Sequence, residues 1–398
     1  MRTNELSGHK GEPMSQRRVV VIGGGAVGLA TAVHLTKMDQ SLDVLVLEAD
    51  YVGSGSSSRS VGVVETQYVG EFDIAVRAYG REFCDELAEN EGLRFVRTGY
   101  VRLASQESDF KDYELSIKRQ QDCGIFDARV LDVSEVEKLI PQISMNGRLG
   151  GLYGPSDGFL DGHLYCSLLT EIVTRQGGKV LQNTKVVGIE NSTDGAILIE
   201  TTKGNFIADE VVNAAGGWAR QIGDLLGAPV PLVPQLHSAA LIQMSGPLDN
   251  MIPMVMDYVP GSGKAGLYFR FERPDQLVAG LHIEEAVDGA ADPDAYSESG
   301  TPEFIAELAE LISERLPGLP DGGISRAWSG IYPMTEDRSP YVGSHPANSK
   351  VKCALGAGGN GIQLSPAIGR AVAEEIILGK MPSLPESNPW TAARLISD

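Results

Sequence analysis

The sequence predicts an α/β fold in which a discontinuous Rossmann-type domain is joined to a second, α+β domain built on a mixed β-sheet. An apolar run at 19–22 precedes a glycine-rich turn and a helical pattern, which is typical of a β-α-β unit. Successive strand patterns follow much later, across 236–285. A strand, a glycine turn and a helix recur at 351–380, so the chain is expected to return to its first domain near its end.

The first glycine turn has the spacing of a dinucleotide-binding fingerprint, Gly23-x-Gly25-x-x-Gly28. The first glycine permits a tight turn, the second lets the backbone approach a pyrophosphate, and the third lets the helix pack close to the sheet. The helix N-terminus then offers unpaired N–H groups to the phosphates. Glu48 ends the next apolar strand, where an acid binds ribose hydroxyls and disfavours a 2′-phosphate. The fingerprint alone leaves NAD and FAD open.

The composition disfavours several partners. Because 33 Lys and Arg stand against 53 Asp and Glu, the formal net charge is −20, and such a surface repels nucleic acid and anionic lipid. No apolar run reaches the length of a membrane span. The four cysteines form no C-x-x-C pair, so we expect no metal site and a cytoplasmic protein with reduced thiols. Residues 1–16 are expected to form a flexible tail, with Met14 as an alternative start.

Periodicity and turn residues predict the elements between the two glycine turns. Helical patterns cover 71–91 and 162–176, and Thr301-Pro302 caps a further amphipathic helix. The Gly/Ser-rich segment 53–62 is expected to form a loop. Strands are expected at 43–48, 179–182, 185–190, 196–201, 208–212, 237–244, 266–272 and 277–283.

The choice between cofactors rests on four segments taken together. They are the fingerprint, GSGSSSRSVG at 53–62, VVNAAGGWA at 211–219 and GAGGNGIQLSPAIGR at 356–370. Together they resemble the D-amino-acid-oxidase-like flavoprotein family, in its sarcosine oxidase and dimethylglycine dehydrogenase branch, over about residues 18–380. The resemblance implies FAD and a glutathione-reductase-like FAD fold. The expected FAD-binding domain comprises 17–80, 150–235 and 325–398, and the expected substrate-binding domain comprises 81–149 and 236–324.

The fingerprint and the resemblance together imply a set of cofactor-binding residues. They are Gly23, Gly25, Ala26, Val27, Gly28, Glu48, Ser56, Ser57, Ser58, Arg59, Val186, Ala215, Gly216, Gly358, Gly359, Asn360, Gly361, Ile362 and Gln363. Some relatives attach the flavin covalently, at positions that match Arg59 and Gly330 here. Because arginine and glycine do not provide the usual attachment, we expect non-covalent FAD.

The resemblance also implies where the substrate binds. The residues that match substrate-facing positions are Tyr268, His282 and Tyr332. The alternative is a Tyr and a His that are buried in the core and hydrogen-bond only to each other. Two positions that carry cations for a substrate carboxylate in sarcosine oxidases match Glu65 and Gln363. Either Arg59 or Arg270 then binds the carboxylate, or the substrate carries a neutral or cationic group there.

These features predict an FAD-dependent enzyme that oxidises a small amine or amino acid, with hydride transfer to flavin N5 and an imine product. Tyr268 and Tyr332 would position the substrate, and His282 would help to keep the amine neutral or would take its proton. The alternatives are a 2-hydroxy-acid dehydrogenase and a flavin-bearing β-subunit of a heteromeric dehydrogenase. The acceptor is O₂ or an electron-transfer partner, and the absence of lysine from 277–280 favours the partner.

Overall fold

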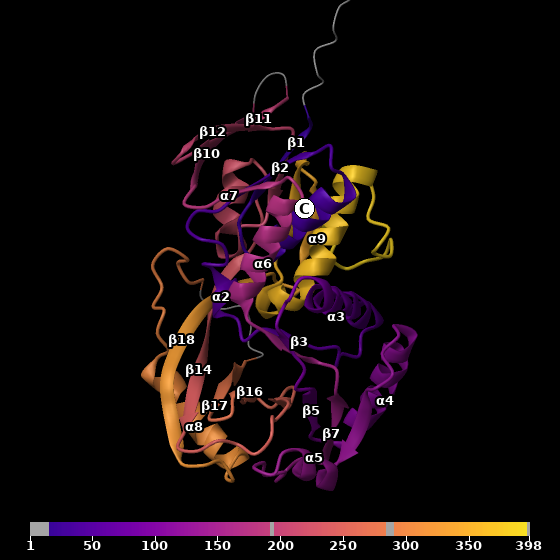
Figure 1. Cartoon of the computed structure of the whole chain (residues 1–398), viewed down its shortest axis with the longest axis vertical. Helices are drawn as coiled ribbons and strands as arrows, with labels where there is room; N and C mark the ends of the chain where they lie inside the picture. Colours follow the sequence, from indigo (N-terminus) through magenta and orange to yellow (C-terminus); the bar gives the residue numbers. More distant parts are fainter. Residues whose placement is uncertain (1–15, 192–194, 284–289, 396–398) are drawn as a thin grey trace, which may run out of the picture.

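Residues 16–191, 195–283 and 290–395 are described in the computed structural model, which has the predicted α/β fold and consists of two bodies (Figure 1). The upper body in Figure 1 is built on a six-stranded sheet of order β19-β20-β13-β1-β2-β9, in which every pair is parallel except β19–β20. Its strands are β1 (Arg18–Ile22), β2 (Asp43–Leu47), β9 (Lys179–Leu181), β13 (Glu210–Asn213), β19 (Tyr341–His345) and β20 (Asn348–Leu355).

Both faces of this sheet are buried, because alternate residues of β1 pack to opposite sides. Val19 and Val21 share a core with helices α1, α3, α6 and α9, whereas Val20 and Ile22 share a core with α7 and a small antiparallel sheet. The helices are α1 (Ala26–Met38), α3 (Glu71–Asn90), α6 (Gly162–Arg175), α7 (Ala219–Leu225) and α9 (Gly361–Leu378), and the small sheet comprises β10 (Val186–Asn191), β11 (Ile197–Thr201) and β12 (Gly204–Ala208). Burial on both faces explains why β1 is continuously apolar.

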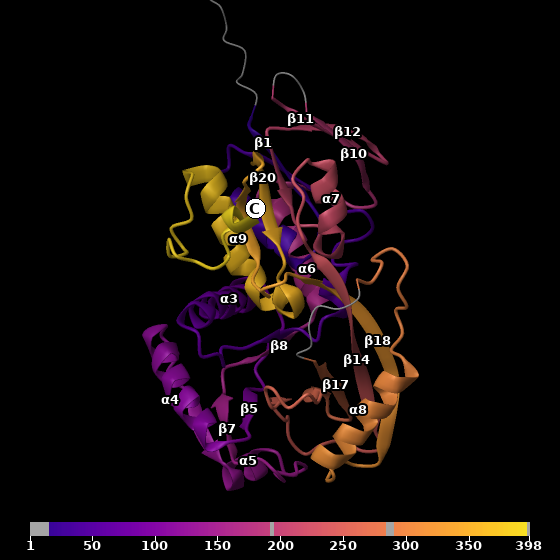
Figure 2. The same ribbon diagram turned by 180° about the vertical axis from the view of Figure 1, so that it is seen from behind.

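The lower body is built on an eight-stranded mixed sheet of order β18-β14-β17-β16-β15-β5-β7-β6. All pairs are antiparallel except β5–β15. The strands are β5 (Tyr100–Ala104), β6 (Arg129–Asp132), β7 (Gly150–Gly154), β14 (Val233–Met244), β15 (Met254–Asp257), β16 (Gly266–Arg273), β17 (Gln276–His282) and β18 (Gly322–Met334). A third small sheet, β3 (Val63–Val64), β8 (Gly158–Leu160) and β4 (Phe95–Val96), lies where the two bodies meet (Figure 2).

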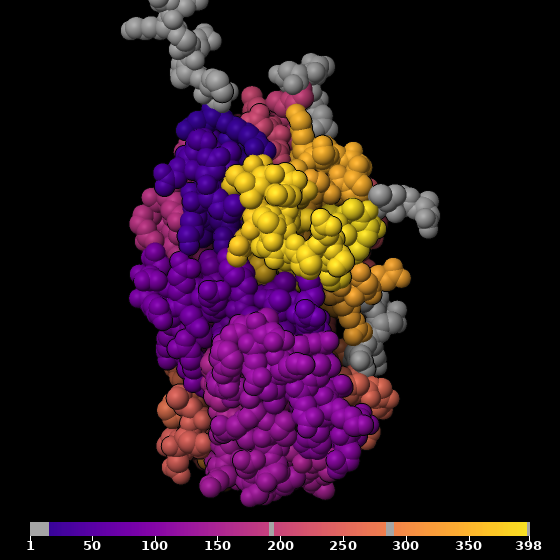
Figure 3. Space-filling view, turned by 90° about the vertical axis from the view of Figure 1, so that its right-hand side faces the viewer, coloured from indigo at the N-terminus to yellow at the C-terminus, as the bar shows by residue number. Residues whose placement is uncertain are grey.

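Helices pack on both faces of the eight-stranded sheet. Leu308 and Ile312 of α8 (Pro302–Arg315) share a core with Phe269 of β16 and Val255 of β15. As the sequence predicts, the Thr301 side chain caps α8 by accepting a hydrogen bond from the Phe304 N–H at 3.2 Å. α4 (Glu107–Asp122) and α5 (Val133–Leu139) belong to a lobe that projects below the C-terminal segment (Figure 3). α4 packs on the opposite face, where Phe110 and Tyr113 share a small core with Ala104 of β5 and Leu152 of β7. A small cavity lies on the part of that face formed by β14, β16 and β18.

Sheet membership differs at three points from the domain boundaries expected from the sequence. β7, the start of β14 and β18 pair within the eight-stranded sheet, although 150–154, 233–235 and 325–334 are expected in the FAD-binding domain. The glycine-rich sequence of 150–161 predicts a turn. Gly150–Gly154 nevertheless forms the strand β7, which pairs along one edge with β5. Non-local pairing of this kind leaves no local signal.

Three short elements also escape the sequence pattern. In β12 and β15 the alternation of apolar and polar residues is too short to predict a strand. Each of them forms because it pairs with a neighbouring strand, β11 in the first case and β16 in the second. The segment expected as a loop at 53–62 contains the single helical turn α2 (Ser56–Arg59). Within the described residues the 3₁₀ turns are η1 (Gly216–Trp218), η2 (Gly358–Asn360) and η3 (Ala392–Leu395).

The two glycine turns are held together by the packing of α1 on α9, which lie side by side in Figures 1 and 2. A Cβ atom at Gly369 would lie 2.6 Å from the Thr31 backbone nitrogen, so only glycine permits this close crossing. Among the described residues, no helix is long and apolar enough to cross a membrane.

Burial of His34 in α1 makes stability depend on pH. Its side chain is 5% exposed, packs against Phe83 with ring centroids 5.4 Å apart, and burial lowers its pKa from 6.5 to about 3. Below pH 6.5 the imidazole of His34 binds a proton in the unfolded chain but not in the folded chain. The free energy of unfolding therefore has its full value above pH 6.5 and decreases as the pH falls toward 3.

We expect His34→Leu to remove this dependence. The wild-type protein should lose about 2 kcal/mol more of its unfolding free energy than the variant between pH 7 and pH 5. Urea denaturation at the two pH values measures the difference. His163→Leu, at an exposed position of α6, is the control and should keep the wild-type profile. Equal losses in wild type and His34→Leu would contradict the assignment.

Candidate cofactor and substrate site

Two of the three fingerprint glycines, Gly23 and Gly28, sit where no larger residue fits. Gly23 has a φ of +114°, and a Cβ there would lie 2.4 Å from the carbonyl oxygen of Ala214, the residue that follows β13. A Cβ on Gly28 would lie 2.0 Å from the Gly23 carbonyl oxygen. Gly25 is the N-cap of α1, and a Cβ there would meet only the Ser57 hydroxyl, at 3.2 Å. The turn thus presents a bare helix N-terminus, which is the cradle that a pyrophosphate requires.

Glu48 organises the turn beside the ribose position. Its carboxylate accepts hydrogen bonds from the Gly24 N–H at 2.7 Å and from the Asp50 N–H at 2.9 Å. The carboxylate therefore joins the end of β2 to the glycine turn at the end of β1. An acid at this point is placed to bind ribose hydroxyls.

A cavity of about 500 Å³ extends from this turn to the start of α9. Most of the expected cofactor residues line it: Gly23, Gly25, Ala26, Val27, Glu48, Ser56, Ser57, Arg59, Val186, Ala215, Gly216, Gly358, Gly359, Gly361 and Ile362. Gly28, Ser58, Asn360 and Gln363 do not line it. Gly28 instead packs α1 against β1, and its effect on the cavity is indirect.

The segment around α2 joins the two bodies at the cavity. The Ser57 hydroxyl accepts a hydrogen bond from the Ala26 N–H at 3.0 Å, at the N-terminus of α1. The Ser56 hydroxyl donates to the Ile331 carbonyl of β18, and the Trp328 indole N–H donates to the Arg59 carbonyl at 2.9 Å. The eight-stranded sheet is therefore attached directly to the cofactor cavity.

The 3₁₀ turn η2 and α9 form the far end of the cavity. A Cβ on Gly359 would lie 2.4 Å from the Tyr332 ring, so glycine is needed for the ring to rest on this turn. Tyr332 also stacks on His237 of β14, with ring centroids 4.0 Å apart and planes 16° from parallel. Tyr332 thus contacts both an imidazole and the turn expected to contact the isoalloxazine ring.

Tyr268, His237 and Tyr332 project from the same face of the eight-stranded sheet. Tyr268 lies opposite Gly280, which lies opposite Ala239, and His237 is two residues from Ala239 along β14. Residues directly opposite each other, or two apart, share a face. A Cβ on Gly280 would lie 2.2 Å from the Tyr268 hydroxyl, so this glycine lets the phenol ring lie across β17.

These three side chains, with Ser56 and Arg59, line a second cavity of about 20 Å³ next to the larger one. Burial raises the pKa of Tyr332, and burial and the neighbouring Tyr332 raise the pKa of Tyr268, so both phenols stay protonated. Burial and then the nearby His282 lower the pKa of His237 to about 4, so its imidazole is neutral at pH 7. The site therefore combines two hydroxyl donors with a neutral imidazole.

The other expected substrate residues line neither cavity, although His282 is on the same face of the sheet as Tyr268, two residues after Gly280. The ring of His282 packs edge-on against Tyr258 with centroids 4.6 Å apart. Glu65 is 3% exposed, and its carboxylate accepts a hydrogen bond from the Gln67 N–H at 2.6 Å. The Glu65 N–H donates to the Gln363 side chain at 3.1 Å, so the structure brings this pair together behind the flavin turn.

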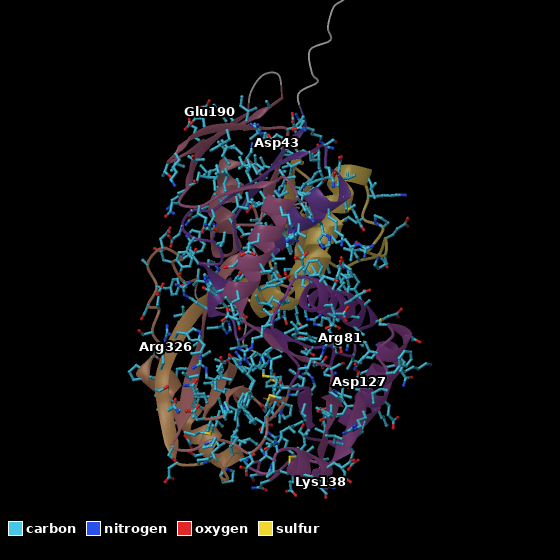
Figure 4. All side chains as sticks on the ribbon, viewed as in Figure 1. Asp43, Arg81, Asp127, Lys138, Glu190 and Arg326 are labelled. Atoms are coloured by element: carbon cyan, nitrogen blue, oxygen red, sulfur yellow. The ribbon has the colours of Figure 1, made fainter. Side chains whose placement is uncertain are left out.

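Sequence reasoning missed two parts of the site. The sequence around His237 does not mark this residue as part of a site. Only the pairing of its strand with β18 brings it next to Tyr332. The segment 290–300 crosses the large cavity, which Pro293, Asp294, Tyr296 and Glu298 help to line. There the Trp218 indole N–H donates to Asp294 at 2.9 Å, and Arg59 forms an ion pair with Glu298. Charged side chains such as Arg326 and Lys138 lie at the periphery, away from this junction (Figure 4).

This arrangement defines a dinucleotide-binding enzyme whose cofactor cavity opens on a second sheet. The chain belongs to the FAD dependent oxidoreductase family (DAO), whose sequence profile matches residues 18–375. FAD is therefore its cofactor, and the cradle formed by Gly23, Gly25 and Glu48 fits the pyrophosphate and ribose of that molecule.

Similar proteins act on small amines and amino acids. The chain is 28% identical to mouse mitochondrial sarcosine dehydrogenase, over 92% of this chain and 40% of the relative. It is 26% identical to the glycine oxidase of Geobacillus kaustophilus, over 89% of this chain and 92% of that protein. The crystal structure of L-proline dehydrogenase from P. horikoshii superposes with a TM-score of 0.81 at 27% identity, covering 92% of this chain and 96% of that one. The chain spans less than half the length of the mitochondrial relative.

Two glycine variants should separate the folding of the turn from its use. Gly28→Ala places a methyl group against backbone, so we expect apoprotein stability to fall by roughly 1–3 kcal/mol and FAD to be lost. Gly25→Ala meets only a rotatable hydroxyl, so apoprotein stability should stay close to wild type while FAD affinity falls about tenfold or more. Calorimetry of the apoprotein and FAD titration by fluorescence give the two readouts. Loss of apoprotein stability in both variants would contradict this division.

Proposed function

We propose that the protein oxidises a small amine or amino acid, with the substrate held between Tyr268, His237 and the flavin turn at Gly358–Gly361. The observation that carries the proposal is the contact of Tyr332 with both His237 and Gly359, which joins the sheet face to the expected position of the isoalloxazine ring. The names of similar proteins, which include sarcosine, glycine and proline as substrates, support the same reaction class.

The residues of the chain orient the substrate and control its proton. Bound FAD supplies the chemistry, because it accepts a hydride from a C–H bond next to nitrogen. Only an unprotonated amine can release that hydride, since its lone pair stabilises the cation that forms. A neutral His237 can accept a hydrogen bond from the amine, and the two protonated phenols can donate to the substrate. His237 thus takes the role that the sequence suggested for His282.

A second candidate is that the chain acts as the flavin-bearing subunit of a heteromer. It is supported by 24% identity to the sarcosine oxidase β-subunit of Rhodobacter capsulatus, over 93% of this chain and 87% of that protein. In that case electrons would leave through a partner, as the lysine-free strand at 277–280 also suggests. Electron transfer to a partner and a cytoplasmic location stay predictions.

Anaerobic reduction of the purified holoprotein tests the reaction class. We expect proline, sarcosine or a simple secondary amine to bleach the flavin absorbance in a stopped-flow instrument, because the site holds a neutral amine beside the hydride acceptor. 2-Hydroxy acids such as lactate are the comparison set. Bleaching by 2-hydroxy acids alone would replace the proposal with the hydroxy-acid dehydrogenase, and turnover by the isolated chain would exclude an obligatory partner.

The flavin should also be removable without breaking a bond. The two positions at which relatives carry attachment residues are Arg59 and Gly330, which lie side by side: a Cβ on Gly330 would be 3.2 Å from the Arg59 Cβ. We expect acid precipitation to leave all flavin absorbance in the supernatant. Yellow colour retained by the washed pellet would show a covalent link.

A further inference from the structure

We propose that the clasp (residues 290–300) is a lid on the FAD cavity, held shut by side-chain contacts, and that it must open before FAD enters or leaves. The clasp lies between β17 and α8, and therefore belongs to the segment that follows the eight-stranded sheet rather than to the nucleotide-binding body. In Figure 1 it belongs to the orange loop at the outer edge of the molecule, beside the upper end of β18. The inference concerns the cofactor and holds whichever substrate is oxidised.

The clasp forms part of the wall of the large cavity. Its lining residues are Pro293, Asp294, Tyr296 and Glu298, and they line the same cavity as the first glycine turn and the α2 segment. The cradle for the pyrophosphate is complete without them, because the bare helix N-terminus comes from α1 alone. The clasp therefore adds a wall that the binding of a dinucleotide does not by itself require.

Backbone hydrogen bonds anchor the two ends of the clasp to the eight-stranded sheet. The Ala291 N–H donates to the Pro234 carbonyl of β14 at 2.8 Å, and the Ser329 N–H of β18 donates to the Glu298 carbonyl at 2.9 Å. Gly300 packs directly on β18, since a Cβ there would lie 2.7 Å from the Cβ of Ala327. The part of the clasp that can move is therefore its middle.

Side chains alone hold the middle of the clasp across the cavity. The Asp294 carboxylate accepts hydrogen bonds from the Trp218 indole N–H at 2.9 Å and from the Gln221 amide at 3.4 Å. The Glu298 carboxylate forms an ion pair with Arg59 of α2. Within 290–300 and the other described ranges, no backbone hydrogen bond joins the clasp to η1, α7 or α2. These two carboxylates are therefore the latch of the lid.

The latch can break without unfolding the rest of the protein. The Glu298 side chain is 68% exposed and the Arg59 side chain is 20% exposed. Ion pairs between exposed groups contribute little to stability, and salt screens them. Local opening of a surface segment needs only such contacts to be lost. We therefore expect the clasp to open transiently, and more often at high ionic strength.

The charges of the clasp favour a latch over direct binding of the cofactor. The clasp carries the carboxylates of Asp292, Asp294 and Glu298, whereas the diphosphate of FAD is anionic. Carboxylates and phosphates repel each other, so an acid beside this ligand needs its charge met by the protein. Arg59 meets the charge of Glu298, and N–H donors of η1 and α7 meet that of Asp294.

A lid has a kinetic signature that a direct contact lacks. Because it must open for entry and for release, a weaker latch raises the rate constants of FAD association and dissociation by the same factor, and Kd does not change. Loss of a residue that binds FAD directly would instead raise the dissociation rate constant and Kd together.

The first test weakens the latch with Glu298→Gln, alone and together with Asp294→Ala. Glu307→Gln is the control, because it removes the same charge from an exposed position of α8 and lines neither cavity. Quenching of FAD fluorescence on mixing with apoprotein measures association. Transfer of FAD from holoprotein to an excess of a second apoflavoprotein measures dissociation.

We expect Glu298→Gln to raise both rate constants about 2- to 5-fold, and the double variant to raise them further, with Kd unchanged. The control should show wild-type rates. Added salt should speed dissociation from the wild-type protein more than from Glu298→Gln, because the variant has no ion pair to screen. Wild-type rates in the double variant, or a raised Kd with unchanged association, would overturn the lid.

The second test locks the clasp with a disulfide. A Cβ on Gly217 of η1 would lie 3.6 Å from the Cβ of Pro293, which is within the range of about 3.5–4.5 Å found in disulfides. Gly217→Cys/Pro293→Cys is made in a Cys123→Ser background, because Cys123 is the exposed one of the four cysteines. Mass spectrometry under non-reducing conditions identifies the bridged protein.

We expect the bridge to lower both rate constants roughly tenfold or more, because the clasp can no longer open locally, and we expect a phosphine reductant to restore them. The background protein with Cys123→Ser alone should not respond to the reductant. Equal rates in the bridged and the reduced protein would show that FAD passes without movement of the clasp, which would overturn the proposal.

Discussion

The close approach of backbone to backbone at the first glycine turn is the constraint on which the rest of the structure depends. Gly28 rests on the Gly23 carbonyl, and Gly23 rests on β13, so β1, its helix and a strand some 190 residues later in the chain share one contact point. The second glycine turn is fixed against the first because Gly369 of α9 touches the backbone of α1. Both ends of the cofactor cavity are therefore set by contacts that a single methyl group would break.

The eight-stranded sheet supplies what the nucleotide-binding body lacks. A helix N-terminus and an acid bind a dinucleotide, but they do not distinguish one reaction from another. The face of the sheet that α8 leaves uncovered carries the phenols and the imidazole, and glycines at 280 and 359 make room for the rings. Specificity is thus built from side chains on several strands, each fixed by register rather than by a loop.

The sequence predicted the parts of the molecule whose signals are local. The fingerprint, Glu48, the capped helix at Thr301 and the late glycine turn all follow from patterns within a few residues, and the structure has each of them. His237 was missed because only the pairing of its strand with β18 brings it to Tyr332. The segment 290–300 was missed because its contacts are with residues 70 or more positions away.

Glu65 shows why a charge cannot be interpreted from position alone. In the sequence it stands where relatives carry a cation, which suggests that the substrate has the opposite charge. In the structure its carboxylate is turned to a backbone N–H, and the nearby Asp157 has a pKa raised to about 8 by burial and by Glu65 itself. A buried carboxylate that is already hydrogen-bonded gains little from a cationic ligand that it cannot reach. The position of this acid in the sequence therefore gives no information about the charge of a substrate group.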